Sequence, residues 1–130
     1  MEYELCKKLK DAGFPQEYKK TKPLIDCAFD EKRELHLLHK DNDTDWWIGN
    51  NYNHSNMSIE EVQKNWVKSP TLSELIKECG KDFGMLFLID QKWGARMRPQ
   101  DITNAWKITI FYDSSPKKAV TKLWLSLNNK

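Results

Sequence analysis

Apolar residues recur at helical spacing in four parts of the chain, and residues that begin or end helices bound each part. The pattern predicts helices near residues 5–12, 59–67, 71–79 and 116–127. Ser58 and Thr71 are each followed three residues later by a glutamate, which is the spacing of a capping box. Gly13 and Gly80 stand where a left-handed residue ends a helix, and Ser115 is the expected N-cap of the last helix.

Alternation of apolar and polar residues predicts strands in the second half of the chain. Three runs, at residues 84–90, 93–98 and 105–112, are separated by short polar segments, and Gln91–Lys92 is expected to form the first turn. Connections this short predict an antiparallel meander. The apolar stripe of the last helix is expected to cover one face of this sheet, which gives an α+β fold.

The first half of the chain is less regular. Residues 34–39 and 46–48 are β-prone and flank a polar, turn-rich stretch, so a hairpin is expected there. Residues 16–32 predict only an irregular or short extended piece. No repeat or linker interrupts the chain, and we therefore expect one α+β domain over residues 1–130.

Composition and charge exclude several classes of protein. The chain has 130 residues and a net charge of +2, which excludes a polybasic or acidic tail. Six Trp, four Tyr and five Phe argue against intrinsic disorder. No apolar run is long enough to span a bilayer, and the first residues lack the apolar core of a signal peptide. We therefore expect a soluble cytoplasmic protein without a membrane partner.

The cysteines and histidines do not predict a metal or cofactor site. An odd number of cysteines is a poor disulfide framework, and two of the three fall on or beside apolar stripes of predicted helices: Cys6, Cys27 and Cys79. His36 and His39 lie on a predicted strand, where their side chains point to opposite faces. A site built from these two histidines with Cys27 and His54 is an alternative, but its spacing matches no zinc pattern. No enzyme motif is present, and no catalytic residue, metal or cofactor is predicted.

One candidate interaction surface is basic. Arg96 and Arg98 alternate with apolar residues, so they project from one side of a strand, and Lys107 is a candidate on the neighbouring strand. Such a face would bind phosphate or an acidic protein. With Phe111 or Phe87 nearby it would also stack single-stranded bases. The alternative is an ordinary solvated sheet face.

The second candidate surface is the tryptophan pair. Trp46 and Trp47 are adjacent on a predicted strand and therefore point to opposite faces. An exposed Trp beside acidic residues would be a good interface anchor. The alternative is that residues 16–32 cover both rings.

Three further segments are distinctive: K-K-L-K-D-A-G-F-P-Q (7–16), S-P-T-L-S-E-L-I-K-E-C-G (69–80) and S-P-K-K-A-V-T-K-L-W-L-S-L-N (115–128). Together they resemble a group of small phage, prophage and gut-bacterial proteins that have no assigned function. The resemblance does not extend to residues 17–66, and the group usually has two glutamates where this chain has Lys117 and Lys118. It implies a phage or mobile-element origin. It implies no activity and transfers no functional residue.

These observations favour a small non-catalytic protein-interaction module that modulates a host or phage protein. A nucleic-acid-binding protein with a basic sheet face is the first alternative, and a small nucleotide-binding protein or enzyme is the second. The sequence leaves the oligomeric state open.

Overall fold

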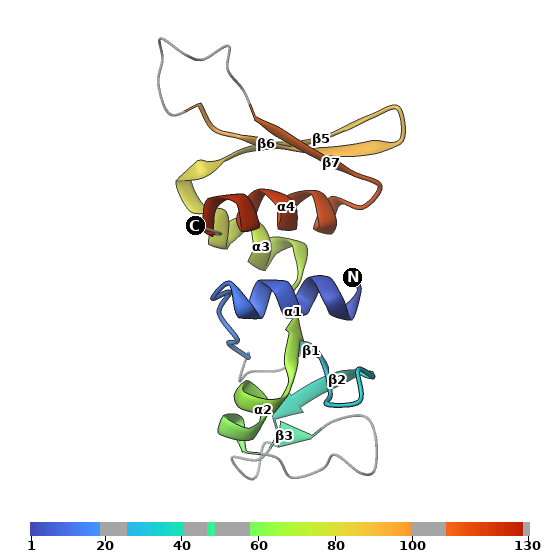
Figure 1. Cartoon of the computed structure of the whole chain (residues 1–130), viewed down its shortest axis with the longest axis vertical. Helices are drawn as coiled ribbons and strands as arrows, with labels where there is room; N and C mark the ends of the chain where they lie inside the picture. Colours follow the sequence, from blue (N-terminus) through green and yellow to red (C-terminus); the bar gives the residue numbers. More distant parts are fainter. Residues whose placement is uncertain (19–25, 41–46, 49–57, 100–108, 129–130) are drawn as a thin grey trace. The chain divides into compact units, whose positions relative to one another are not determined.

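The computed structural model describes residues 1–18, 26–40, 47–48, 58–99 and 109–128 (Figure 1). The chain divides into two compact units, Met1–Pro70 and Thr71–Lys130. Each unit combines helices with its own antiparallel sheet, so the predicted α+β fold class is confirmed. The single domain expected over residues 1–130 stays a prediction.

The first unit contains a four-stranded sheet in the order β3-β2-β1-β4, in which every neighbouring pair is antiparallel. Its elements are α1 (Tyr3–Asp11), β1 (Asp26–Phe29), β2 (Leu35–Lys40), β3 (Trp47–Ile48), α2 (Ile59–Asn65) and β4 (Val67–Ser69). The predicted hairpin is confirmed as β2 and β3, with Lys40 opposite Trp47. The short extended piece expected within residues 16–32 is β1, which lies between β2 and β4.

The second predicted helix ends earlier than expected. It stops at Asn65, because Trp66 is extended, with φ −108° and ψ 156°. Val67 then pairs with Phe29 of β1, and these strand contacts replace the last helical turn. The N-cap is as predicted: the Ser58 hydroxyl accepts the backbone N–H of Glu61.

Helix α1 ends as its sequence predicts. Gly13 has φ +96°, a conformation that suits glycine because it has no Cβ. The N–H of Gly13 donates to the Lys10 carbonyl at 3.0 Å, and that of Phe14 donates to the Leu9 carbonyl at 2.9 Å. This pair of hydrogen bonds is a Schellman motif, and it brings the Phe14 side chain into the interior.

Both faces of the first sheet carry apolar side chains. Ala28 and Leu38 pack on one face with Trp66 and other buried residues of the unit. Phe29 packs on the opposite face with Cys6 of α1 and Val67 of β4. On β2 of this second face, two leucines stay about half exposed: Leu35 and Leu37.

The second unit contains the predicted meander in the order β5-β6-β7. Its elements are α3 (Leu72–Cys79), the 3₁₀ helix η2 (Gly80–Asp82), β5 (Phe83–Ile89), β6 (Lys92–Met97), β7 (Ile110–Asp113) and α4 (Pro116–Asn128). The first part of the predicted strand 105–112 lies outside the described residues, which resume at Thr109. Helix α4 packs against β6 and β7 on one side and against α3 on the other (Figure 1).

The turn between β5 and β6 is displaced by one residue from its predicted position. Asp90 and Gln91 have φ values of +49° and +65°, as in a type I′ turn. Lys92 is not part of the turn, because it pairs with Ile89. The turn position decides which residues of the two strands lie opposite each other.

The N-caps of the second unit follow the sequence. The Thr71 hydroxyl accepts the Glu74 N–H at 3.2 Å, and the Glu74 carboxylate accepts the Thr71 N–H at 3.0 Å, so the capping box is complete. Ser115 caps α4 by accepting the N–H of Lys118 at 3.4 Å. The predicted stripe of α4 is buried: Ala119, Val120, Leu123 and Trp124.

Candidate functional site

The sheet of the second unit has one face covered by α4 and one face that no described helix covers. Residues directly opposite each other on antiparallel strands share a face. Ala95, which is fully buried, lies between Leu86 and Phe111, and this row faces α4. The row of Phe87, Gly94 and Tyr112 therefore lies on the other side. We define this other side as the open face, and its described side chains are Met85, Phe87, Ile89, Lys92, Arg96, Ile110 and Tyr112.

The open face is apolar. Met85, Ile89 and Tyr112 are 47%, 56% and 46% exposed. A shallow hollow runs over this surface, lined by Met85, Phe87, Ile89, Arg96 and Ile110. In an antiparallel sheet with one face on the core, residues along a strand alternate, and those on the solvent-facing side are normally polar. Clustered apolar side chains in that position are typical of an interaction site.

The aromatic side chains of this face have a defined arrangement. The Phe87 and Tyr112 rings meet edge to face, with centroids 6.0 Å apart and an interplanar angle of 85°. The Phe87 ring lies directly over Gly94, where it fills the space that a Cβ would take. The glycine thus lets an aromatic ring lie flat on the middle strand.

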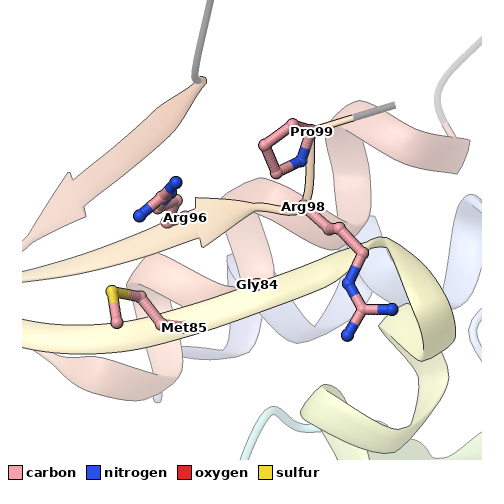
Figure 2. A pocket seen from close by; sticks show the side chains of 5 residues that line it. All are labelled: Gly84, Met85, Arg96, Arg98 and Pro99. Carbon is pink, nitrogen blue, oxygen red and sulfur yellow. The ribbon is translucent and has the colours of Figure 1, made fainter. Parts of the chain in front are cut away.

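Arg96 and Arg98 lie at the same end of the open face. Figure 2 shows both side chains around a second hollow, which is also lined by Gly84, Met85 and Pro99. The N–H of Arg98 donates to the Asp82 carbonyl at 2.8 Å, and this bond continues the β5–β6 pairing past the end of β6. The two arginines thus project to the same side, as alternation along a strand requires. Within the described part of the chain, neither guanidinium has an ion pair or a side-chain hydrogen bond.

The covered face carries charge of the opposite sign. Asp113 of β7 lies opposite Trp93 on that face, and its carboxylate is 3.0 Å from the Lys122 ammonium of α4. Burial alone would raise the pKa of Asp113. The hydrogen bond and charge of Lys122, helped by the N–H of Ser115, outweigh burial and lower that pKa. The carboxylate of this sheet is therefore neutralised by the helix that covers it.

Not every predicted interaction residue lies within the described part of the chain. Lys107 and Trp46 lie outside it. Trp47 lies in β3, but the structure does not describe its side chain. Of the two rings that the sequence offered as alternatives beside the arginines, Phe87 lies on the open face and Phe111 does not. Phe111 pairs with Ala95 and so lies on the α4 side of the sheet.

The apolar members of the open face were not predicted as interaction residues. These are Met85, Ile89, Ile110 and Tyr112. The signal that would have found them is register. Once the turn is placed at Asp90–Gln91, every second residue of β5 from Met85 onward shares the face of Arg96.

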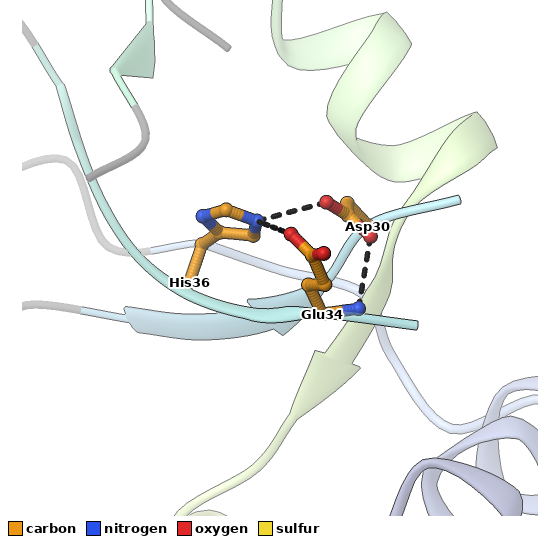
Figure 3. Close-up of side chains that lie close together, drawn as sticks. All are labelled: Asp30, Glu34 and His36. Carbon is orange, nitrogen blue, oxygen red and sulfur yellow. Dashed lines mark hydrogen bonds and ion pairs between the residues drawn. The ribbon is translucent and has the colours of Figure 1, made fainter. Parts of the chain in front are cut away.

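A second cluster of chemistry-bearing side chains lies in the first unit, at the turn between β1 and β2 (Figure 3). Asp30 and His36 are 2% and 4% exposed, and Glu34 is exposed. The Asp30 Oδ1 accepts the N–H groups of Lys32 and Glu34 at 2.8 and 2.9 Å. Its Oδ2 is 2.8 Å from the His36 Nε2, which in turn is 3.9 Å from a Glu34 oxygen.

This cluster has the donor types of a metal site but the geometry of a turn clamp. The three ligand atoms lie within 4.8 Å of one another. Both Asp30 oxygens, however, already accept hydrogen bonds that hold the turn, in which Arg33 has φ +66°. Burial alone would raise the pKa of Asp30, but the backbone N–H of Glu34 and the His36 hydrogen bond lower it overall. The alternative site with Cys27, His39 and His54 shares only His36 with this cluster.

No protein-family model, no curated protein and no solved structure matches the chain. Among the described residues, no helix combines the length and apolarity needed to cross a membrane. The resemblance to small phage proteins therefore stays a prediction.

Proposed function

We propose that this chain is a small non-catalytic protein-interaction module whose docking surface is the open face. The observation that carries the proposal is the group of half-exposed apolar side chains, Met85, Ile89 and Tyr112, on a sheet face beside Arg96. Methionine, aromatic residues and arginine are the types enriched at protein interfaces. Lysine, glutamate and aspartate are depleted there, and Lys92 is the one such residue among the described side chains of this face.

The framework of the sheet suits such a role. Helix α4 and the type I′ turn hold the strands, so the open face is presented on rigid elements. Phe87 lies over Gly94 and against Tyr112, which limits the side-chain entropy that these rings lose on binding. A surface ordered in advance loses less conformational freedom when a partner covers it.

The expected origin completes this proposal. The resemblance to small phage and prophage proteins makes a host or phage protein in the cytoplasm the expected partner. An accessory protein that modulates such a partner needs a docking surface and no catalytic residues. This part of the proposal rests on the three sequence segments alone.

One observation favours nucleic acid as a second candidate. The Phe87–Tyr112 ring pair lies on a sheet that also carries Lys92, Arg96 and, at its end, Arg98. Aromatic rings on a sheet stack single-stranded bases, and neighbouring cations bind the phosphates. The larger share of aliphatic side chains on the open face favours a protein partner.

The proposal is tested by capture of partners from host lysate with the tagged full chain, after nuclease treatment. The informative variant is Ile89→Ser with Tyr112→Ser, which removes apolar surface from the open face. Its matched control is Leu35→Ser with Leu37→Ser, which removes similarly exposed leucines from the first unit. Circular dichroism checks that all three proteins are folded.

We expect a discrete protein that the wild type and the control capture and that the open-face variant does not. A partner that survives the open-face substitutions but is lost with the control would contradict the proposal. The second candidate would be favoured if the chain captures nucleic acid alone from a lysate that was not treated with nuclease, and if moderate salt releases it.

A further inference from the structure

We propose that the occupant of the open face is an amphipathic helix of a partner protein, with carboxylates flanking its apolar stripe. This inference rests on the proposed function and adds the chemistry of the partner. It follows from the charges of the two sides of one sheet.

The covered face shows how this sheet takes a helix. Helix α4 packs an apolar stripe against β6 and β7, and Lys122 beside that stripe pairs with Asp113 of the sheet. The Lys122 ammonium also donates to the Tyr112 carbonyl at 2.8 Å. The covered face therefore combines apolar contact with one pair in which the helix supplies the cation and the strand supplies the anion.

The open face has the same apolar character and the reverse charge. Its described charged side chains are Lys92 and Arg96, with Arg98 beside them, and all three are cationic. In the described parts of β5 to β7 and their turn, the acidic residues are Asp90, which is in the turn, and Asp113, which α4 neutralises. A helix that complements this face must therefore carry carboxylates where α4 carries lysine.

Charge also disfavours a second copy of this chain as the occupant. Two open faces stacked on each other would bring the cationic groups of one copy against those of the other, and like charges across an interface are unfavourable. The neighbouring arginines already lie together around one hollow (Figure 2). Carboxylates of a partner could accept hydrogen bonds from either guanidinium group.

The apolar part of the open face has the dimensions of a short helix. Met85, Phe87 and Ile89 alternate along β5 and span about 13 Å at the usual rise of a strand. A helix covers that distance in about nine residues, which present an apolar stripe of three or four side chains. Flanking glutamates on such a helix would reach toward the arginines at the end of the face.

The experiment uses two synthetic 18-residue helical peptides with the same stripe of leucine and phenylalanine. One has glutamates beside the stripe and the other has lysines. Binding to the full chain is measured by fluorescence anisotropy at about 0.1 M salt, where charges within about 10 Å of each other still interact. A twelve-residue oligothymidine is titrated in parallel.

We expect the glutamate peptide to bind at least tenfold more tightly than the lysine peptide. Arg96→Glu with Arg98→Glu should weaken binding of the glutamate peptide at least tenfold and strengthen binding of the lysine peptide. Ile89→Ser with Tyr112→Ser should weaken the binding of both peptides. The matched control for charge is Lys77→Glu with Lys81→Glu, which changes the net charge equally at exposed lysines of α3 and η2 outside the open face.

The failures of the two proposals are distinguishable. Suppose that the peptides bind equally, or that neither binds, while capture of a protein from lysate still depends on Ile89 and Tyr112. The proposal of an acidic helix is then wrong, and the proposed docking surface is retained. If the captured protein does not depend on those two residues, the docking surface itself is wrong. If oligothymidine binds more tightly than the glutamate peptide and the double arginine variant no longer binds it, the occupant is single-stranded nucleic acid. The proposal of an acidic helix is then also wrong.

Discussion

The ring of Phe87 occupies the space in which any residue other than glycine at position 94 would place its Cβ. An ideal Cβ on Gly94 would lie 2.4, 2.7 and 2.8 Å from three atoms of that ring. Separations below 3.0 Å force something to move. The ring is the part free to move, so the residue at position 94 controls the aromatic surface of the open face.

Gly94→Ala should therefore destabilise the second unit by about 1–3 kcal/mol, the usual range for an inserted methyl group in a packed position. The displaced ring also loses its edge-to-face contact with Tyr112. The measurement is the free energy of opening of the β6 amides by native-state hydrogen exchange. The same substitution in a Phe87→Ala background should destabilise the unit little, because no ring is there to clash with the added Cβ. An equal cost in both backgrounds would contradict the prediction.

Asp30→Asn should destabilise the first unit by about 1–3 kcal/mol at neutral pH, since it weakens a buried acceptor of three hydrogen bonds. The pKa of Asp30 is lowered by folding. Its contribution to stability is therefore present above the unfolded pKa of about 3.9 and is lost as the pH falls through the folded pKa.

The difference in the free energy of unfolding between wild type and Asp30→Asn should accordingly become smaller below about pH 4. Hydrogen exchange or urea unfolding, followed at β1 and β2, measures it. The control is Glu34→Gln, which changes an exposed carboxylate of the same turn and should cost far less. A difference that is unchanged down to pH 2 would show that the Asp30 carboxylate does not act as a clamp.

Thr71→Ala should destabilise α3 by about 1 kcal/mol, because it removes the hydroxyl that accepts the Glu74 N–H. Ser73→Ala, two residues further along the same helix and exposed, is the matched control and should be neutral or slightly stabilising. Urea unfolding followed by far-ultraviolet circular dichroism separates the two. Equal effects of the two substitutions would assign the loss to hydroxyl removal in general and not to the cap.

Cys79 should resist alkylation in the folded chain. Burial, with the nearby carboxylates of Asp82 and Glu78, raises the pKa of its thiol to about 12. At pH 8 only about one thiol in ten thousand would be the reactive thiolate. Mass spectrometry after brief iodoacetamide treatment should find modification at the partly exposed Cys27 before Cys79. Urea should remove this protection. Rapid modification of Cys79 without urea would contradict its burial.

Local signals in the sequence account for the helices and the meander. The capping box at Thr71, the Schellman motif at Gly13 and the N-cap at Ser115 each depend on residues within one or two turns of the helix end. The side that Arg96 and Arg98 share follows from alternation along a single strand. These features are local in origin, so tertiary contacts do not need to be known to predict them.

Tertiary pairing decided what the sequence pattern did not. Trp66 and Val67 continue a helical pattern, but pairing of Val67 with Phe29, 38 positions earlier in the chain, made the segment a strand. The sequence left open whether Phe111 or Phe87 lies beside the arginines. The register of β6 against β7 put Phe111 under α4 and Tyr112 on the open face.

By itself, then, the sequence determined the α+β class, the helix caps at Gly13, Ser58, Thr71 and Ser115, and the alternation within each strand. Only the tertiary structure decided which side of the meander α4 covers and which apolar side chains remain exposed around Arg96. Alternation divides a strand into two sets of side chains but does not say which set faces the core when both sets are apolar. That choice depends on contacts between residues far apart in the chain, and here it created the open face.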